Sequence, residues 1–471
     1  MTAQFSSNGG TILSTNELHP VTKLFAEFIA NAEPSILPPT LISRLKEYFL
    51  DYLGVTIAAS HEWESTEQIV QGIVALGARN GSSTVPLKGS NFLPQYAGLL
   101  NATFGHTMDF DDTYALGTLH AGTCAWPAAL TQAELLGSEG ATSKQFLLAA
   151  AVGYEIICRL GGKLRNDAYE RGFHNTATAG IFGAVAAISV LKRLSASTIE
   201  TAFGLALSKA AGSMQYLENG SWNKRIHPGF AVHDAFVCVS LAEAGVVGAA
   251  RSIEGKYGFL HSYTPRTGHD LPSLTADLGV RWDFLETALK PYPACRMTHG
   301  LIEVGGSIGL QNKGREVKKM IISLSSPNHI VVGSRIPNKL HPDNIVDAQF
   351  SAYFQLAHAW LYGPETGVEF AKRLKDESIR ILSDNIECII DDTVKAMGSK
   401  LHIEYADGES HDVDIPFPLG EPEHPFNREQ AEAKYFSLVV PVLGKEKAQK
   451  IKALVEELEE GSVVKLFHMI A

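Results

Sequence analysis

The sequence predicts a mainly α-helical protein with a smaller inserted α/β (α+β) domain, which we call the lid. Apolar residues recur at three- and four-residue steps over residues 42–53, and similar patterns follow up to about residue 284. Runs rich in β-branched residues begin only later, at 317–325, 386–390 and 400–405. Helical periodicity returns after a proline-rich segment at 416–425.

These changes in pattern predict two domains. Residues 19–284 and 419–471 are expected to form a large helical domain, and residues 285–418 the α/β lid. Many of the predicted helices are dense in Ala and Gly, so we expect their backbones to pack closely. Residues 1–18 are rich in Ser, Thr, Asn and Gly and are expected to be a disordered lead-in.

Composition limits the partners of the chain. Its 471 residues are 45% hydrophobic and 19% charged, which is typical of a globular protein. The formal net charge of −11 argues against nucleic acid as a partner, although a local cationic pocket for a small anion remains compatible with it. The longest apolar run, 229–250, contains charged residues, so we expect a buried helix and no membrane partner.

Cysteine usage and the N-terminal segment bear on the compartment. The five cysteines include no CxxC pair, which argues against a zinc ribbon or a thioredoxin-like centre and fits reduced intracellular thiols. The first residues are polar and do not resemble a secretory signal. We therefore expect a cytoplasmic protein, with a mitochondrial location left open.

The densest cluster of reactive side chains lies at residues 106–122, which read HTMDFDDTYALGTLHAG. A buried polar group without a partner costs roughly 1–3 kcal/mol. The cluster is therefore either a hydrogen-bonded structural element, such as a set of helix N-caps, or a reaction site. Proton transfer near neutral pH uses such mixtures of carboxylate and imidazole. We expect Asp109, Thr113 and His120 to face a substrate.

A second candidate is the segment GFHNT at 172–176, which opens an Ala/Gly-rich helix. The N-terminus of a helix offers free N–H donors and partial positive charge, which suit a carboxylate. His174 is therefore a candidate site residue. The alternative is that Asn175 or Thr176 only caps the helix.

The third segment, SWNKRIHPG at 221–229, combines two cations with an imidazole. Lysine acts as a point charge and arginine as a planar fork for carboxylates. We expect Lys224, Arg225 and His227 to bind an anion, the alternative being a solvated loop.

The fourth segment, KPYPACRMTHG at 290–300, lies at the predicted domain junction, where ligand sites are common. Tyr292, Cys295, Arg296 and His299 are candidates for substrate binding or catalysis. The neighbouring arginine would lower the pKa of the thiol. The alternative is a rigid hinge with an inert thiol.

A GxSxG match at 305–309 is set aside, because the nucleophile elbow needs a strand before it and residues 299–304 read as a helix.

Taken together, the motifs DFDDT with LHAG, GFH, KRIHPG and KPYPACRMTHG resemble the MmgE/PrpD superfamily over about residues 20–460. That superfamily includes 2-methylcitrate dehydratases, cis-aconitate decarboxylases and iminodisuccinate epimerase. The resemblance implies a helical domain with a lid, a homodimer, a site between the domains and no metal or organic cofactor.

The resemblance also implies roles for particular residues. Asp109, Thr113, His120, His174 and Lys224 fall on substrate-site positions of decarboxylase-like members. Cys295 departs from the animal decarboxylases, which resemble PAH there, and from the dehydratases, which resemble PAE. Fungal-type decarboxylases look similar to this chain in carrying cysteine, so the subfamily is left open.

The expected function is proton-transfer chemistry next to a carboxylate of a small di- or tricarboxylate. Lys224, Arg225 and Arg296 would clamp carboxylates, His120 and His174 would exchange protons, and Asp109 would orient an imidazole. Decarboxylation of cis-aconitate to itaconate is the leading hypothesis. Dehydration of a 2-alkylcitrate, epimerisation by two bases, and carboxylate binding without catalysis are the alternatives.

Overall fold

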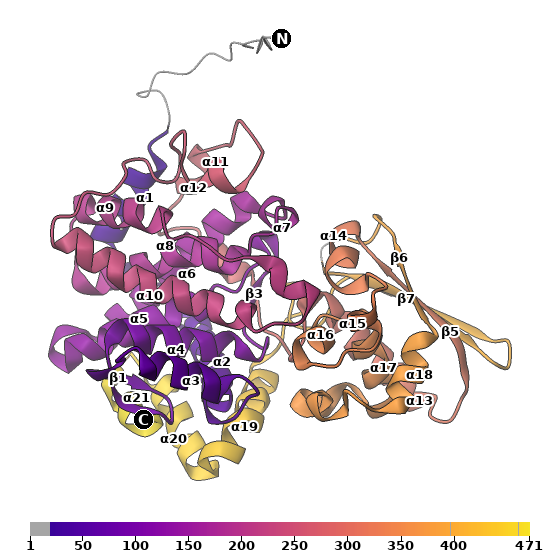
Figure 1. The fold of residues 1–471 in the computed structure, drawn as a ribbon. Helices are drawn as coiled ribbons and strands as arrows, with labels where there is room; N and C mark the ends of the chain where they lie inside the picture. The colour runs from indigo at the N-terminus through magenta and orange to yellow at the C-terminus, as the bar shows by residue number, and fades with distance from the viewer. Residues whose placement is uncertain (1–18, 396, 460) are drawn as a thin grey trace, which may run out of the picture.

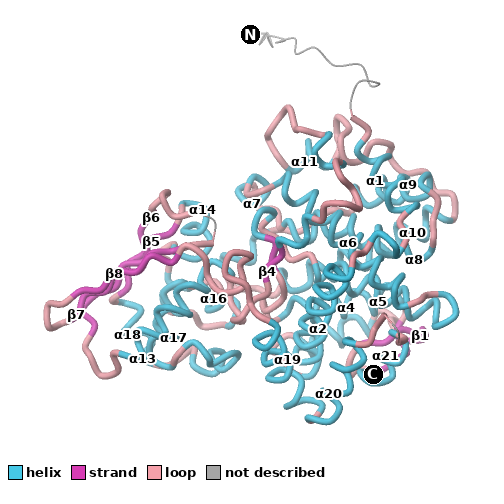
Figure 2. The backbone as a smooth tube through the Cα atoms, turned by 180° about the vertical axis from the view of Figure 1, so that it is seen from behind, coloured by secondary structure: helices cyan, strands magenta, loops and turns pink. Residues whose placement is uncertain are grey.

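The computed structural model describes residues 19–395, 397–459 and 461–471, and it shows a large helical lobe beside a smaller lobe (Figure 1). The expected lead-in, residues 1–18, lies outside the described residues. Helices dominate both lobes, and the four-stranded sheet lies in the smaller one (Figure 2). The predicted fold class, mainly α with a small α/β part, is confirmed.

The first part of the large lobe is built almost entirely from helices. They are α1 (Val21–Asn31), α2 (Pro39–His61), α3 (Thr66–Ala75), α4 (Pro94–Thr107), α5 (Gly122–Gly140), α6 (Ser143–Leu164), α7 (Asp167–Glu170), α8 (Asn175–Lys192), α9 (Ala196–Leu207), α10 (Asn223–Glu243), α11 (Phe259–Tyr263) and α12 (Pro272–Thr275). Two short antiparallel pairs accompany them: β1 (Arg79–Val85) with β2 (Gly89–Phe92), and β3 (Thr113–Tyr114) with β4 (Thr287–Ala288).

Helices α6 and α8 pack closely in the middle of this lobe, because small residues face each other across their contact. A Cβ added to Gly183 in α8 would lie 2.5 Å from the carbonyl oxygen of Gly153 in α6. Helix α8 is long and apolar enough to span a membrane, but 94% of its residues are buried inside the protein. It is the central core helix, as the Ala/Gly-rich pattern predicted.

The C-terminal helices α19 (Arg428–Leu443), α20 (Lys445–Glu456) and α21 (Val463–Ile470) return to the large lobe. Helix α19 packs along α2, and α21 packs on α5. One hydrophobic core contains residues from both ends of the described chain, including Phe25, Phe49, Tyr435 and Phe467. The domain boundaries at residues 285 and 418 stay a prediction.

The smaller lobe contains a four-stranded sheet in the order β6-β5-β7-β8. The strands are β5 (Val317–Leu324), β6 (Ile386–Ile390), β7 (Ser399–Tyr405) and β8 (Ser410–Ile415). Strands β5 and β6 run parallel, and the other neighbours are antiparallel. The three runs expected from the sequence are therefore present as β5, β6 and β7.

The rest of the smaller lobe is helical, with α17 lying against α13, α18 and β6. Its helices are α13 (Gly306–Gln311), α14 (Ser326–Asn328), α15 (Pro337–Leu340), α16 (Ile345–Gln349), α17 (Ala352–Tyr362) and α18 (Glu377–Asp384). A π-helical turn at Leu301–Gly305 leads directly into α13. No strand precedes the GxSxG match, so setting it aside was correct.

Candidate active site

The site is built on the loop that follows α4. Asp109 adopts a left-handed backbone (φ 51°) just after the helix end, a conformation that costs a non-glycine residue free energy. Three side chains from distant parts of the chain hold the carbonyls of residues 108–110: Gln349 (2.7 Å to 108), Lys290 (to 109) and Lys434 (2.7 Å to 110). The large lobe, the junction and the lid therefore fix this loop together.

A buried Lys–Asp–Lys cluster lies at the lobe junction. Lys224 Nζ, from the first turn of α10, is 2.6 Å from Asp109 Oδ1, and Lys290 Nζ is 3.3 Å from Asp109 Oδ2. Burial alone would raise the pKa of Asp109, but the two ammonium groups hold it far below its usual range. Burial lowers the pKa of Lys290, and Asp109 opposes this effect. One carboxylate thus pairs with both lysines, and the nearby Asp111 supplies a second negative charge that acts on Lys290.

Two imidazoles share the Asp111 carboxylate beside this cluster. Asp111 Oδ2 is 2.7 Å from His106 Nδ1 and 3.3 Å from His120 Nδ1. Burial lowers the pKa of His106 to about 3, so its ring is neutral at pH 7. Because Lys224 Nζ lies 3.0 Å from His106 Nε2, that nitrogen accepts from the ammonium group and Nδ1–H donates to Asp111. His106 is therefore a fixed support for Lys224.

His106, Asp111 and His120 are also the described residues with the spacing of a metal site, since their ligand atoms lie within 4.8 Å of one another. Two ligand atoms of a tetrahedral zinc ion would be about 3.3 Å apart. The 2.7 Å separation between His106 and Asp111 is shorter than that and has the length of a strong hydrogen bond. The trio fits a hydrogen-bonded triad better than a metal centre.

A small cavity of about 40 Å³ lies next to these charges. It is lined by Asp109, Thr113, Tyr114, Ala115, Thr118, Leu119, His120, Tyr169, Lys224, Cys295, Arg296, Met297, Val331, Phe350 and Met397. This space holds a few water molecules but no six-carbon acid. A neighbouring cavity of about 540 Å³ shares Tyr114, Ala115, Thr118, Met297 and Met397 with it, so these residues separate the site from the wider space.

Cys295 reaches the cavity from the junction. Burial raises the pKa of its thiol to about 11, and the nearby Asp109 charge adds to this effect. The cysteine is therefore a neutral thiol at pH 7. The expectation that Arg296 lowers this pKa is wrong, because Arg296 directs its charge elsewhere.

Arg296, His299 and Tyr292 form a separate group in the junction. Arg296 Nε donates to Glu421 (2.6 Å), and Nη1 contacts His299 Nδ1 (2.9 Å), so the guanidinium is already paired although it borders the cavity. His299 Nε2 lies 3.0 Å from a backbone carbonyl. Tyr292 lines a different cavity, of about 450 Å³. The structure gives these side chains contacts that support the junction.

Arg225 also lies away from the cavity. It contacts Glu64 and donates to Ser65 Oγ (3.1 Å). Successive residues on an α-helix point about 100° apart, so Lys224 and Arg225 cannot face the same space. The expectation that the two cations clamp one substrate together is corrected.

His174 and His227 form a pair behind the cavity. Their Nδ1 atoms are 3.1 Å apart, and the ring of His174 is stacked on His106 with centroids 5.6 Å apart. Neither histidine lines the small cavity. Tyr169 lies between His174 and the cavity, and the centroids of the Tyr169 and His174 rings are 6.1 Å apart. His227 instead lines a surface pocket.

Sequence reasoning missed three members of the charged cluster. His106 and Asp111 were inside the recognised motif, and the five-residue spacing of an imidazole and a carboxylate after a helix could have pointed to them. Lys290 was a lone lysine in an apolar junction, which is a signal for a buried, paired charge. The lid residues Val331, Phe350 and Met397 carried no signal, since each is an ordinary core residue in sequence.

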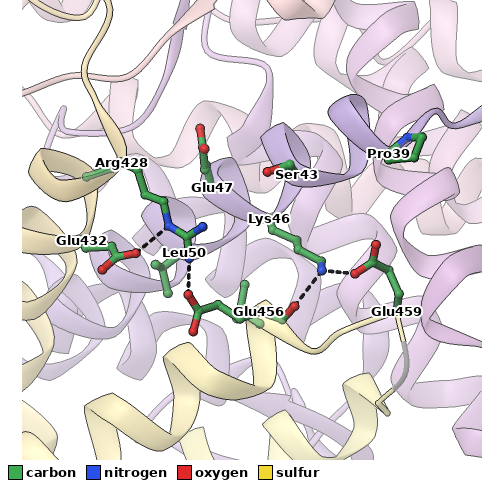
Figure 3. Close-up of a pocket in the computed structure, with 11 residues that line it drawn as sticks. Pro39, Ser43, Lys46, Glu47, Leu50, Arg428, Glu432, Glu456 and Glu459 are labelled. Atoms are coloured by element: carbon green, nitrogen blue, oxygen red, sulfur yellow. Dashed lines mark hydrogen bonds and ion pairs between the residues drawn. The ribbon is translucent and has the colours of Figure 1, made fainter.

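A second hollow, between α2 and the C-terminal helices, resembles an anion site only at first sight (Figure 3). Its volume is about 160 Å³. Arg428 pairs with Glu432 (2.8 Å) and with Glu456, and Lys46 pairs with Glu459. Both cations that the figure draws are thus engaged by carboxylates, so this hollow is not a candidate for carboxylate binding.

Fold and site together define a two-lobed, mainly helical class of protein with a buried, lysine- and histidine-rich site at the lobe junction. The chain belongs to the MmgE/PrpD family: residues 23–271 match the MmgE/PrpD N-terminal domain, and residues 292–460 match the MmgE/PrpD C-terminal domain.

Individual relatives carry names that bear on the reaction. The chain is 25% identical to a cis-aconitate decarboxylase-like protein, oryM, of Aspergillus oryzae, over 94% of this chain and 95% of that protein. It is 26% identical to a cis-aconitate decarboxylase of Aspergillus terreus, over 94% of each chain. It is 29% identical to the human cis-aconitate decarboxylase, over 68% of this chain and 65% of the human protein.

Proposed function

We propose that the protein is a lyase acting on a small tricarboxylate, and that its reaction is the decarboxylation of cis-aconitate to itaconate. The observation that carries the proposal is the buried Lys224–Asp109–Lys290 cluster, of which Lys224 and Asp109 line a small cavity together with His120. The names of the relatives support the choice of substrate.

Lys224 and Lys290 supply the positive charge for substrate carboxylates. Lys224 uses two of its three N–H donors on Asp109 and His106, so one donor remains for a ligand. Away from bulk water, each charge-assisted contact is stronger than at the surface. Thr113 Oγ1 is buried without a hydrogen-bond partner among the described residues, so it is free to contact the same ligand.

The bond changes follow from the substrate. The bond from the CH₂ carbon to its carboxylate breaks and CO₂ leaves. The electron pair forms the new CH₂=C double bond, and the former double bond becomes a carbanion next to another carboxylate. That carboxylate shares the negative charge, which the two lysines stabilise as it develops. A proton on the carbanion carbon completes itaconate.

His120 is the proton donor in this proposal. It lines the cavity with its Nδ1 near Asp111, while its Nε2 lies 3.9 Å from Asp109 Oδ1. Asp111 orients the ring and stabilises the imidazolium, as a carboxylate does behind a catalytic histidine. Cys295 contributes a neutral thiol at the same cavity, in place of the imidazole or carboxylate that other branches of the family carry there.

The test is to incubate the purified protein with cis-aconitate and to follow itaconate and CO₂ by NMR. Itaconate formation supports the proposal. An alkene from 2-methylcitrate without product from cis-aconitate would assign the dehydratase branch, and racemisation of a chiral carbon without CO₂ would assign an epimerase. Calorimetric binding of citrate-like acids without turnover would identify a binding protein. A homodimer stays a prediction, which sedimentation equilibrium tests.

A further inference from the structure

The proposed decarboxylation, on which this inference rests, consumes one proton at carbon in every turnover. That proton must reach a site whose cavity measures only about 40 Å³ in this structure. The wider cavity on the Met297 and Met397 side is the natural route for substrate, since five residues line both spaces. A substrate that fills this route would also block it for water.

A second connection to solvent starts at the His174–His227 pair. The two Nδ1 atoms lie 3.1 Å apart, within hydrogen-bond distance. Burial lowers the pKa of His227 to about 4, and it lowers that of His174 well below 6.5. Both rings are thus neutral at pH 7, so one Nδ1–H donates to the lone pair of the other. Such a pair passes a proton along without holding it.

The outer member of the pair, His227, is buried but reaches a surface pocket. His227 lines an open surface pocket of about 690 Å³, together with Ser221, Trp222 and Phe230. Among the described residues, none that line this pocket also line the substrate-side cavities. Gly212 lies at the pocket next to both histidines, where a Cβ would be 3.5 Å from His227 Nδ1. The absence of a side chain there keeps the space around the pair open.

The inner end of the pair faces the charged cluster. His174 is fully buried, and its Nε2 has no hydrogen-bond partner among residues that the structure describes. Its neighbours are His106, stacked at 5.6 Å, and Tyr169, which lines the catalytic cavity. Lys224, His106 and His120 are the titratable groups whose charges act on His174 from the site, and Tyr216 packs against both rings of the pair.

We infer that His227 and His174 form a proton relay that returns a proton from bulk solvent to the active site after each turnover, by a route separate from that of the substrate. A solvent acid protonates His227 at Nε2, and His227 passes its Nδ1 proton to His174 Nδ1. His174 then releases its Nε2 proton to a water or substrate group that leads to His120. Each ring gains one proton and loses one, so the relay ends with its tautomers exchanged and no net charge. Rotation of the rings out of their shared hydrogen bond lets each ring lose one N–H proton to water and take one up at its other nitrogen, which restores the starting tautomers.

The experiment measures kcat and KM for cis-aconitate with and without added imidazole, at constant pH and ionic strength. His227→Ala opens a space next to His174 that imidazole can enter. We expect kcat to fall at least about tenfold, within the range for lost proton transfer, with KM within about twofold. Imidazole is expected to raise kcat of this variant in a saturable way and to leave the wild type unchanged.

Two further variants serve as controls. His227→Phe fills the space with a ring that carries no nitrogen, so kcat is expected to fall and to stay low with imidazole. Ser221→Ala lies in the same pocket and is expected to behave as the wild type. A wild-type kcat in His227→Ala, or a reduced kcat that imidazole does not raise, would overturn the relay.

Failure of the proposed function is recognised separately. If the wild type releases no CO₂ from cis-aconitate, the decarboxylase proposal is wrong. The relay is then tested separately, by NMR of the full chain labelled with ¹⁵N-histidine. The shared hydrogen bond gives a coupling between the Nδ1 nuclei of His174 and His227, which His227→Ala removes. Absence of that coupling in the wild type would overturn the relay whatever the substrate.

Discussion

Lys224 Nζ lies 2.6 Å from Asp109 Oδ1, although 115 residues separate the two in sequence. Both side chains are buried, and the carboxylate also faces Lys290. A buried charge without its partner costs several kcal/mol, so this contact fixes the start of α10 against the loop after α4. The same contact brings a cation with a spare donor to the cavity that it lines.

Replacing Lys224 tests the carboxylate-binding role. We expect Lys224→Ala to lower kcat/KM for cis-aconitate at least about 100-fold, equal to roughly 2.7 kcal/mol of transition-state stabilisation. Lys209→Ala is the matched control, because that lysine is exposed and pairs with Asp234 on the outside of α10. Near-wild-type kinetics in Lys224→Ala would remove this residue from the mechanism.

Replacing His120 tests the proton donor. His120→Ala is expected to lower kcat/KM at least about 100-fold, mostly through kcat, because a general acid acts in the transition state. His233→Ala is the control, since that partly exposed histidine pairs with Asp234 far from the cavity. Steady-state kinetics in which only KM rises would show that His120 binds substrate and does not donate the proton.

The buried ion pair between Lys434 and Asp51 carries a prediction on stability. Their charged atoms are 2.6 Å apart, and Lys434 also donates to the carbonyl of Phe110 in the site loop. Lys434→Met leaves a buried carboxylate unpaired, so we expect a loss of about 3 kcal/mol in the free energy of unfolding.

Chemical denaturation measures this loss, and the double variant Asp51→Asn/Lys434→Met should recover part of it. Lys450→Met, which breaks an exposed pair with Glu446, should change stability by less than about 0.5 kcal/mol. Equal losses in Lys434→Met and Lys450→Met would contradict the prediction.

His106 links stability to pH. Its pKa is about 3 in the folded protein and about 6.5 in an unfolded chain, so between these values the unfolded state binds the extra proton. Folded stability is therefore lost as pH falls from about 6.5 toward 3, by at most about 1.4 kcal/mol per pH unit. The variant His106→Asn keeps an N–H donor for Asp111 and lacks this titration.

Comparing the wild type with His106→Asn isolates the effect of His106 on the pH dependence of stability. Asp112 has the opposite effect on the pH dependence of stability, because burial raises its pKa to about 7. This residue is present in both the wild type and the variant. Denaturation curves between pH 7 and 5 should show the wild type losing more stability than His106→Asn. Parallel pH dependences would mean that His106 is not the buried neutral group described above.

Much of the architecture could be read from local patterns. Three- and four-residue apolar steps marked helices that the structure contains, such as α6 and α8, because one face of each must be buried. Strands β5, β6 and β7 begin and end within about one residue of the expected runs. Asp109, Thr113, His120, Lys224 and Cys295 were all named from their motifs, and the structure places them around one cavity.

Other expectations failed where the direction of a side chain mattered. Arg225 follows Lys224 directly in sequence but points to Glu64, because helix geometry turns neighbouring side chains to different faces. Arg296 is close to the cavity, yet its guanidinium pairs with Glu421, which lies 125 residues further along the chain. Motif content alone contains no information on such pairings.

The sequence by itself determined the fold class, the strands of the lid and the set of motifs that carry acids, imidazoles and lysines, since each is set by local spacing and composition. Only the tertiary structure decided which of these side chains meet. The roles of Lys290, His106 and the His174–His227 pair depend on contacts across 50 to more than 100 residues. Those contacts exist because packing and the cost of burying an unpaired charge select partners in space, whatever their distance along the chain.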